Sequence, residues 1–330
     1  MQDRKKDHID LAFKSLLKSV ENDDRFYYEP FLSAHPTALK PIDFLGKTLK
    51  APIWISSMTG GTKMAGKINR NLAQVASEFG LGMGLGSCRC LLESDDCFDD
   101  FNIRSIIGNE NPLYANLGIG QIEQLLVSNK THLAEELVNK LEADGLIIHV
   151  NPLQEFFQPE GDRFKFAPVD TIEKFLAKTK TKIIVKEVGQ GMGKESLREL
   201  LKLPLQAIEF GAFGGTNFSK LELLRNENSD IKELAPLKNV GHTAPEMLEL
   251  LNELIKEYPG SKPKNIIISG GISSFLDGYY LINKCELSAV YGQGSAFLKY
   301  AMQDYESLQK FVQLQINGLE MAYSFLRIKH

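Results

Sequence analysis

The segment "GLIIHVNPLQE" (residues 145–155) joins a short apolar run to a cluster of polar side chains. Its first four residues are glycine or aliphatic, which is typical of a strand buried on both faces of a sheet. His149, Asn151, Gln154 and Glu155 follow at once, and each can exchange hydrogen bonds or bind a metal ion. One interpretation is an ordinary polar loop. The other is the edge of an active site, built where a buried strand ends.

Seven further short apolar runs repeat this pattern, and most are followed by a longer segment with helical periodicity. They are "PIWISS" (52–57), "GLGMGLG" (80–86), "PLYANLG" (112–118), "KIIVKEVG" (182–189), "LQAIEFG" (205–211), "NIIISGG" (265–271) and "LSAVYGQG" (287–294). Eight alternations of strand and helix require parallel pairing and right-handed crossovers. Eight is also the number of strands that closes a (β/α)8, or TIM, barrel.

An open, doubly wound sheet is the alternative architecture. It usually has fewer strands and a GxGxxG turn after the first of them. Here the first strand ends in "SSMTGGT" (56–62) instead. The sequence therefore predicts an α/β fold of the TIM-barrel class.

The flanking segments complete the predicted architecture. Apolar residues at positions 9, 12, 13, 16, 17 and 20 predict an amphipathic helix over residues 3–20. We expect residues 1–50 to form this helix and a lead-in segment that covers the barrel. Residues 51–330 would form the barrel and a C-terminal helix. The long connections 151–168 and 212–243 would lie at its catalytic end, where such loops are usually lids or disordered segments.

The composition excludes several classes of protein. The 330 residues carry a formal net charge of -4, so no overall field attracts nucleic acid, and no apolar run approaches the ~20 residues that span a bilayer. The four cysteines include no CxxC pair, and the charged start "MQDRKKDHID" lacks an apolar signal core. We therefore expect a cytoplasmic protein with reduced thiols. A zinc site on "CRC" (88–90) would lack a second ligand pair.

Two glycine-rich strand ends, "SGGIS" (269–273) and "YGQGS" (291–295), predict a phosphate site. Glycine lets the backbone approach a ligand closely, and the helix that follows can direct free N–H groups at an anion. In TIM barrels the loops after strands seven and eight commonly bind phosphate. The alternative is that both motifs are only tight turns.

Lys186 lies inside the apolar run 182–189 and shares one strand face with Ile184. A buried ammonium needs an anionic partner. Either Lys186 pairs with a carboxylate such as Glu209, or it lies beside a bound anionic group such as a reduced flavin. His149 is either a structural histidine or a site residue. Glu155 is either a solvated loop carboxylate or a single ligand for a hard divalent ion that also binds substrate phosphate oxygens.

The motifs together resemble one family, the type II, flavin-dependent isopentenyl-diphosphate isomerases. The resemblance covers nearly the whole chain. It is carried by "RKKDHI" (4–9), "MTGGT" (58–62), "GLGMGLGSCR" (80–89), "ANLG" (115–118), "HVNPLQE" (149–155), "VKEVG" (185–189), "FGGTN" (213–217) and "GQGSAFL" (292–298). It implies a barrel that holds FMN and Mg²⁺ and interconverts isopentenyl and dimethylallyl diphosphate. It also implies reduced flavin, hence NADPH or another reductant, and a homo-oligomer, a tetramer or an octamer.

The resemblance also implies roles for individual residues. Gln154, Lys186, His149 and Asn151 would be catalytic, and Glu155 would bind the metal. The flavin contacts would be Met58, Thr59, Gly60, Ser87, Asn116, Lys186, Thr216, Gly270, Gly271, Gly292, Gln293 and Gly294. The diphosphate substrate would contact Arg4, Lys5, Ser87, Arg89, His149, Asn151 and Gln154.

Two departures from the family pattern lie at the flavin phosphate. Ser273 and Ser274 stand where the family often has Arg, and "GQG" (292–294) replaces the usual "GMA". Two other functions stay open at this stage. An FMN-dependent oxidoreductase, such as a 2-hydroxy-acid oxidase or a dihydroorotate dehydrogenase, would need a base beside the flavin, and His242 is the late candidate. A non-catalytic flavin- or phosphate-binding module would explain the altered motifs.

Overall fold

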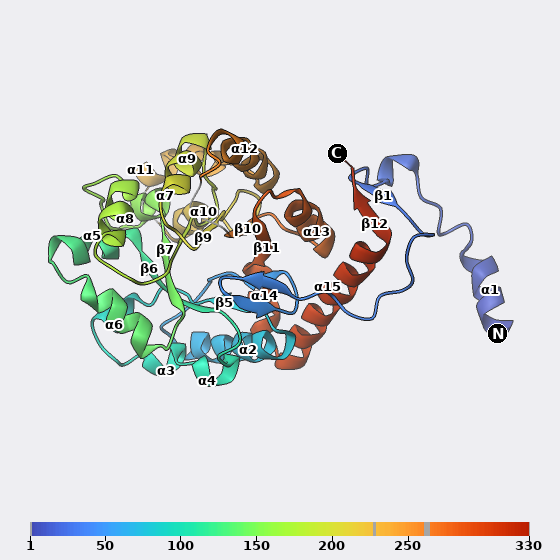
Figure 1. The fold of residues 1–330 in the computed structure, drawn as a ribbon, viewed down its shortest axis with the longest axis horizontal. Coiled ribbons are helices and arrows are strands. Elements are labelled where there is room, and N and C mark those ends of the chain that lie inside the picture. The colour runs from blue at the N-terminus through green and yellow to red at the C-terminus, as the bar shows by residue number, and fades with distance from the viewer. Residues whose placement is uncertain (1, 227–228, 261–264, 330) are drawn as a thin grey trace.

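The computed structural model describes residues 2–226, 229–260 and 265–329, and its centre is a closed barrel of eight parallel strands (Figure 1). The strands are hydrogen-bonded in the order β10-β11-β4-β5-β6-β7-β8-β9. Their bounds are β4 (Ile53–Ile55), β5 (Gly82–Gly84), β6 (Leu113–Gly118), β7 (Gly145–His149), β8 (Ile183–Lys186), β9 (Ala207–Glu209), β10 (Asn265–Ser269) and β11 (Ser288–Gln293). Each lies inside one of the eight apolar runs, so the predicted TIM barrel is confirmed.

Helices surround the barrel and alternate with its strands. They include α2 (Lys63–Phe79), α5 (Ile119–Val127), α6 (His132–Lys140), α8 (Pro168–Leu176), α9 (Lys194–Lys202), α12 (Ala244–Glu257), α13 (Phe275–Lys284) and α14 (Ser295–Ala301). Local signals fix their ends. For α2, the Thr62 side chain accepts a hydrogen bond from Ala65 N–H, and Gly80 ends the helix at a φ of 64°.

The core has two layers, which follow from the alternation of side chains along each strand. Inside the barrel, Trp54, Tyr114 and Ile184 pack with other inward-facing side chains. A hairpin of β2 (Ile42–Phe44) and β3 (Lys47–Leu49) contributes Phe44 and Leu49 to this inner cluster. Outward-facing side chains such as Val185 pack against the helices. Lys186 therefore continues the inward row of Ile184 at the C-terminal end of β8.

The N-terminal segment differs from the prediction. Its helix α1 runs only over Gln2–Leu11, with a short 3-10 turn, η1, at Ser19–Glu21, so the predicted helix over 3–20 is wrong in extent. Its apolar side chains are exposed, including Phe13, Leu17 and Val20. In Figure 1, α1 projects away from the barrel of its own chain. The physical reason is that an amphipathic helix is stabilised by packing of its apolar face, and the described residues of this chain leave that face exposed.

The C-terminal strand pairs with a strand of the N-terminal region on one side of the barrel. β1 (Phe26–Tyr28) pairs antiparallel with β12 (Leu326–Ile328), which follows the long C-terminal helix α15 (Tyr305–Phe325). Figure 1 shows this pair beside the barrel, between it and α1. The predicted C-terminal helix is confirmed. Within the described residues, no helix combines the length and hydropathy required to cross a membrane.

The two long connections contain short helices. Residues 151–168 include α7 (Pro152–Phe157). Residues 212–243 include α10 (Phe218–Arg225), α11 (Ser229–Glu233) and a 3-10 turn, η3 (Ala235–Asn239). The two connections are joined where Asn226 Nδ2 donates to the Phe157 carbonyl at 2.9 Å. They therefore form one structured rim over the carboxyl ends of β7 and β9.

Candidate active site

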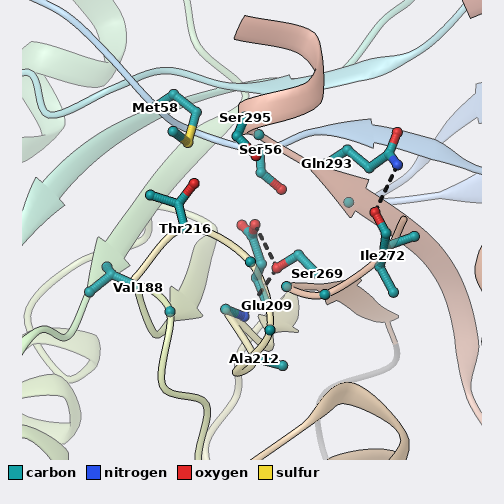
Figure 2. Close-up of a pocket in the computed structure, with 18 of the residues that line it drawn as sticks. Ser56, Met58, Val188, Glu209, Ala212, Thr216, Ser269, Ile272, Gln293 and Ser295 are labelled. Carbon is teal, nitrogen blue, oxygen red and sulfur yellow. Dashed lines mark hydrogen bonds between the residues drawn. The ribbon is translucent and has the colours of Figure 1, made fainter. Parts of the chain in front are cut away.

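A cavity of about 210 Å³ opens at the C-terminal ends of the barrel strands, and we call it the central cavity. Its lining comes from the residues that end β4, β8, β9, β10 and β11, as Figure 2 shows for ten labelled side chains. Eight of the expected flavin contacts line it: Met58, Lys186, Thr216, Gly270, Gly271, Gly292, Gln293 and Gly294. The sequence motifs therefore identified residues from separate strands that the fold brings together.

The glycines of this cavity are required by close packing of backbone. Gly270 and Gly271 have φ values of 91° and 73°, in the left-handed region that favours glycine. A Cβ on Gly270 would lie 2.1 Å from the Ala212 carbonyl oxygen, and one on Gly292 would lie 2.6 Å from Ser56 Oγ. Space for a ligand at this end of the cavity therefore depends on glycine, which has no side chain, at these positions.

The N-terminus of α13 is already occupied by a carboxylate of the same helix. Asp277 Oδ2 accepts hydrogen bonds from Ser273 N and Ser273 Oγ at 3.0 and 2.5 Å, and from Ser274 N at 3.0 Å. Arg25 Nη1 donates to the other oxygen at 2.9 Å. Burial raises the pKa of Asp277, but these donors outweigh it and leave the pKa lowered. The expectation of free N–H groups here is therefore wrong for Ser273 and Ser274, whose N–H groups and hydroxyls are already bonded to Asp277.

Lys186 is buried, and it forms no ion pair within the described part of the chain. It faces Glu209 across the β8–β9 pairing, yet no carboxylate oxygen described lies within 4.0 Å of Lys186 Nζ. The interpretation of Lys186 as one half of a structural salt bridge is therefore not supported. A buried cation without a counter-ion is costly, so this geometry favours a bound anionic group in the central cavity.

Glu209 was considered from sequence only as a partner for Lys186, and the structure gives it a different position. Its side chain is fully buried and lines the central cavity (Figure 2). Oε1 accepts a hydrogen bond from Ser269 Oγ at 3.1 Å, and Ser269 Oγ accepts one from Gly211 N at 3.0 Å. Glu209 Oε2 has no hydrogen-bond partner among the residues described. The sequence signal was its position in the apolar run 205–211, and the structure adds the register with Lys186 of β8.

His149 is held as a neutral imidazole. Its Nδ1 lies 2.8 Å from Asn116 Oδ1, and Asn116 Nδ2 donates to the Leu85 carbonyl at 3.0 Å. Since the Asn116 oxygen must accept, His149 Nδ1 carries the proton and donates. Burial, and then the nearby Lys186 ammonium, lower the pKa of His149 to about 3. Its Nε2 is left as a hydrogen-bond acceptor.

Asn151, Gln154 and Glu155 form a connected cluster at the start of α7. Asn151 Nδ2 donates to Gln154 Oε1 at 3.0 Å and to Glu155 Oε1 at 2.9 Å. Glu155 Oε2 accepts from Asp162 N at 2.7 Å, which ties the far part of the loop to the cluster. The buried Asn151 Oδ1 has no partner in the described structure. In the described residues, no group of three or more His, Cys, Asp or Glu side chains is arranged to bind a metal ion.

The sequence did not reveal Glu222, a buried carboxylate on α10 that joins this cluster. It accepts hydrogen bonds from Gln154 Nε2 at 3.3 Å and from Gln158 Nε2 at 2.8 Å. Arg225 Nη1 also donates to it, at 2.6 Å. The sequence singled out only the length of the connection 212–243, so no local pattern identified Glu222. Its role depends on the contact between the two long connections.

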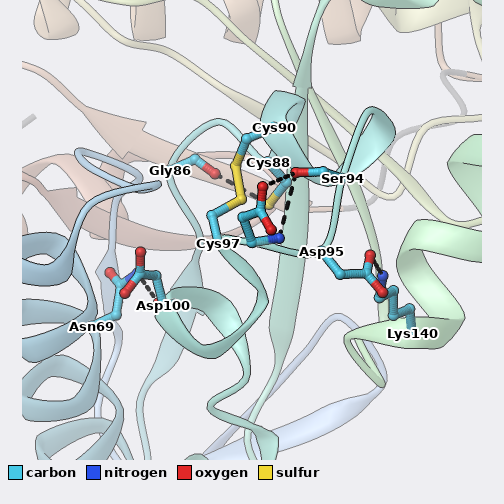
Figure 3. Close-up of a disulfide and its surroundings, with 10 residues drawn as sticks. Asn69, Gly86, Cys88, Cys90, Ser94, Asp95, Cys97, Asp100 and Lys140 are labelled. Carbon is cyan, nitrogen blue, oxygen red and sulfur yellow. Dashed lines mark hydrogen bonds and ion pairs between the residues drawn. A yellow bond between two sulfur atoms is a disulfide. The ribbon is translucent and has the colours of Figure 1, made fainter.

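The β5 end of the site contains a disulfide beside Arg89. Cys90 and Cys97 are bonded across a Cα–Cα distance of 6.7 Å (Figure 3). Cys90 lies in η2 (Arg89–Leu92), and Cys97 directly precedes α3 (Phe98–Phe101). The predicted set of four reduced thiols is therefore wrong for this pair, because these turns fold the chain back on itself. The arrangement stabilises the segment that carries Arg89, whose side chain is 53% exposed and whose Nη1 lies 4.0 Å from Asp162 Oδ2.

The remaining expected contacts are divided between the site and the N-terminal segment. Thr59 and Gly60 follow β4, and a Cβ on Gly60 would lie 2.4 Å from the Phe101 ring. Ser87 is exposed next to Arg89. Arg4 and Lys5 are exposed and lie on α1, the helix that projects away from the barrel (Figure 1). Within a single chain, the structure does not bring these two cations to the site.

Curated relatives match this chain over nearly its full length. The isopentenyl-diphosphate delta-isomerase of Rickettsia africae (strain ESF-5) is 36% identical over 331 residues, which cover 97% of this chain and 92% of the relative. The isopentenyl-diphosphate delta-isomerase of Rickettsia felis (strain ATCC VR-1525 / URRWXCal2) is 35% identical over 330 residues, which cover 97% of this chain and 91% of the relative. The chain belongs to the isopentenyl-diphosphate delta-isomerase family. No family model matches the chain.

Solved structures with lower sequence identity support the fold of this family member. A doubly substituted flavocytochrome b2 with sulfite bound has a TM-score of 0.62 at 14% identity, covering 96% of this chain and 81% of its own. A mandelate oxidase mutant with the monooxide FMN adduct has a TM-score of 0.57 at 13% identity, and the match covers 91% of this chain and 83% of the mandelate oxidase chain. At these identities the comparison establishes the shared barrel alone.

We predict that His149 stays neutral in the ligand-free protein from about pH 9 down to about pH 4. Because its folded pKa lies below the unfolded value near 6.5, the unfolded state binds the proton more readily. This histidine therefore lowers the stability of the fold as the pH falls from about 6.5 towards 3, by at most about 1.4 kcal/mol per pH unit. In the variant His149→Gln, unfolding free energies measured by urea should depend less on pH over this range. A histidine ring resonance of His149 that titrates near pH 6.5 would contradict the assignment.

The disulfide gives a second prediction. The double variant Cys90→Ser/Cys97→Ser should lose about 2–3 kcal/mol of unfolding free energy, because the short closed loop no longer restrains the unfolded chain. Cys285→Ser is the matched control, since Cys285 is a free cysteine away from this loop. Equal urea midpoints for wild type and the double variant under non-reducing conditions would show that the bond does not stabilise the fold.

Proposed function

We propose that this protein interconverts isopentenyl diphosphate and dimethylallyl diphosphate with reduced FMN and Mg²⁺. The observation that carries the proposal is the buried Lys186, without an ion pair among the described residues, at a cavity bordered by two glycine turns. The amide and carboxylate cluster of Asn151, Gln154 and Glu155 follows β7, the strand next to Lys186 in the barrel. Membership of the isomerase family supports the reaction, and the barrel shared with a mandelate oxidase that carries an FMN adduct supports the cofactor.

The central cavity fits FMN in its donor and acceptor chemistry. Gly270, Gly271 and the Gly292–Gly294 turn would hold the phosphate with backbone groups, and Lys186 would lie beside the N1–C2 edge of the ring. The other flavin contacts would be Met58, Thr59, Gly60, Ser87, Asn116 and Thr216. A fixed ammonium beside this edge would stabilise the negative charge of the reduced ring. When bound, the reduced flavin would supply N5 as a proton carrier.

The diphosphate would lie across the β5 and β7 ends of the rim. Arg89 would provide an exposed cation, and His149 Nε2 would face the anion. A negative group beside Nε2 would favour the protonated ring, so His149 would become positively charged only when the diphosphate is bound. Each oxygen of Glu155 accepts one hydrogen bond and keeps a further lone pair, so a magnesium ion could bind it together with phosphate oxygens.

The chemistry moves a double bond and leaves the oxidation state unchanged. One proton is added to the terminal carbon of the double bond, and one is removed from the carbon on its other side. Gln154 does not titrate, so its role would be to orient the reacting carbons or to relay a proton through Glu222. A reductant such as NADPH would be needed only to keep the flavin reduced.

The alternative of an FMN-dependent oxidoreductase is not favoured by the position of His242. This residue lines a different cavity, outside the barrel between α8 and α9, and its Nδ1 lies 2.8 Å from Glu246 Oε1. It is therefore not a base beside the central cavity. The substrate-side cluster around Gln154 also has no use in a module that only binds flavin.

We propose further that the N-terminal segment covers the barrel of a second copy of this chain in a homo-oligomer. The segment exposes six large apolar side chains, Ile9, Leu11, Phe13, Leu16, Leu17 and Val20, that its own barrel does not cover. Arg4 and Lys5 would then bring the missing cations to the diphosphate of that copy.

The assay that tests the reaction uses purified protein with FMN, Mg²⁺ and isopentenyl diphosphate, with and without dithionite. We expect isomerisation only in the reduced sample. Glu155→Gln should lower kcat/KM by at least about a hundredfold at fixed Mg²⁺, because a neutral amide binds the ion poorly. Glu160→Gln, an exposed carboxylate on the same loop, is the matched control. Equal rates with oxidised and reduced FMN would exclude the flavin role proposed here.

For the N-terminal segment, we predict that removal of residues 2–20 lowers the oligomeric state in analytical ultracentrifugation. Arg4→Ala/Lys5→Ala should raise the KM for isopentenyl diphosphate about tenfold or more without changing FMN affinity, because two phosphate contacts are lost. An unchanged oligomeric state in the truncated protein, with an unchanged KM in the double variant, would refute both parts of this proposal.

A further inference from the structure

Three buried polar atoms on the wall of the central cavity have no hydrogen-bond partner in the described structure. They are Glu209 Oε2, Ser56 Oγ and Ser57 Oγ. Glu209 is the most demanding, because its side chain has no exposed area and only one of its two oxygens is satisfied. Lys186 does not satisfy it, since no ion pair joins the two residues. A buried carboxylate oxygen without a donor is costly, so a ligand that offers a donor at this point would be stabilised there.

The position of Glu209 defines which part of a ligand it would meet. The glycine turns after β10 and β11 lie on one side of it, and Lys186 of β8 lies on the other. Figure 2 shows the Glu209 carboxylate next to Ser269, facing the space bordered by Ser56, Met58 and Thr216. A ligand with its phosphate at the turns and its ring at Lys186 would place its connecting chain here.

The two serine hydroxyls are kept available by neighbouring glycines. A Cβ on Gly292 would lie 2.6 Å from Ser56 Oγ, and a Cβ on Gly84 would lie 2.6 Å from Ser57 Oγ. Any larger residue at either glycine would displace these hydroxyls. The cavity wall therefore combines one carboxylate oxygen that only accepts hydrogen bonds with two hydroxyls that both donate and accept.

We infer that Glu209 binds the polyol chain of the cofactor and accepts a hydrogen bond from one of its hydroxyls, with Ser56 and Ser57 completing the contacts. This inference rests on the proposed use of FMN, whose ribityl chain joins phosphate to ring. These contacts would compensate for the weaker binding of the phosphate. The hydroxyls of Ser273 and Ser274 are bound to Asp277, so the polyol contacts carry a larger share of the affinity.

The test compares three probes on the refolded or flavin-stripped full-length chain, with dissociation constants measured by quenching of flavin fluorescence. FMN has ring, polyol and phosphate, riboflavin lacks the phosphate, and lumiflavin lacks both polyol and phosphate. In Glu209→Leu, which keeps most of the volume but removes the acceptor, the dissociation constants of FMN and riboflavin should both rise about ten- to a hundredfold. That of lumiflavin should not change. Glu209→Gln, which keeps one oxygen, should give a smaller rise.

Two controls separate this contact from general damage. Glu123→Gln removes a buried carboxylate on α5 that accepts hydrogen bonds from Lys165 N and Phe166 N, far along the chain from the central cavity lining. It should lower the stability without changing FMN affinity. Without flavin, Glu209→Gln should unfold at a urea concentration no lower than wild type, because it removes the buried carboxylate charge and keeps an oxygen acceptor for Ser269 Oγ.

The outcomes distinguish this inference from the proposed function. Unchanged FMN affinity in both Glu209 variants overturns the inference and leaves the isomerase proposal intact. An equal loss for lumiflavin also overturns it, because the contact would then be to the ring. Wild-type protein that binds FMN but does not isomerise its substrate would overturn the isomerase proposal alone. If wild type binds none of the three flavins, both fail.

Discussion

When eight parallel strands close into a barrel, every second side chain of each strand points into the interior. Burial of a polar group there costs free energy unless the group is hydrogen-bonded or paired. In β8 this row contains Ile184 and then Lys186, at the level where the inner core ends and the central cavity begins. The ammonium is buried by the fold, and its own chain provides no ion pair for it among the described residues. The cavity beside Lys186 can therefore be understood as a site for the anionic group that this buried ammonium needs.

The same constraint explains why several polar groups at this rim are incompletely satisfied. Glu209, Asn151 and the serines after β4 each retain a buried atom without a partner in the described structure. The other two buried glutamates of the described chain have several donors: Glu222 accepts from three side chains, and Glu123 accepts from two backbone N–H groups. Four of the six buried side-chain atoms without a partner in the described structure lie at this rim, and the other two, Trp54 Nε1 and Tyr114 Oη, lie in the inner apolar cluster. Most of the unsatisfied groups are therefore found where a ligand is expected, as in a preorganised binding site.

The sequence predicted those parts of the structure that depend on local periodicity. Every barrel strand lay within an apolar run, and the inward position of Lys186 followed from alternation along β8. The N-terminal helix failed because its pattern showed an apolar face but not whether the chain offers a surface to bury it. The Cys90–Cys97 bond and the position of Glu222 depend on how turns and long connections fold in three dimensions. No spacing in the sequence encodes either of them.

The midpoint potential of bound FMN tests the central claim most directly. If Lys186 stabilises the reduced ring, Lys186→Gln should shift the two-electron potential roughly 30–100 mV more negative, while Lys186→Arg, which keeps the charge, should shift it less. Equal potentials in wild type and Lys186→Gln would show that the buried ammonium does not interact with the flavin. The reason for its burial would then have to be sought elsewhere in the fold.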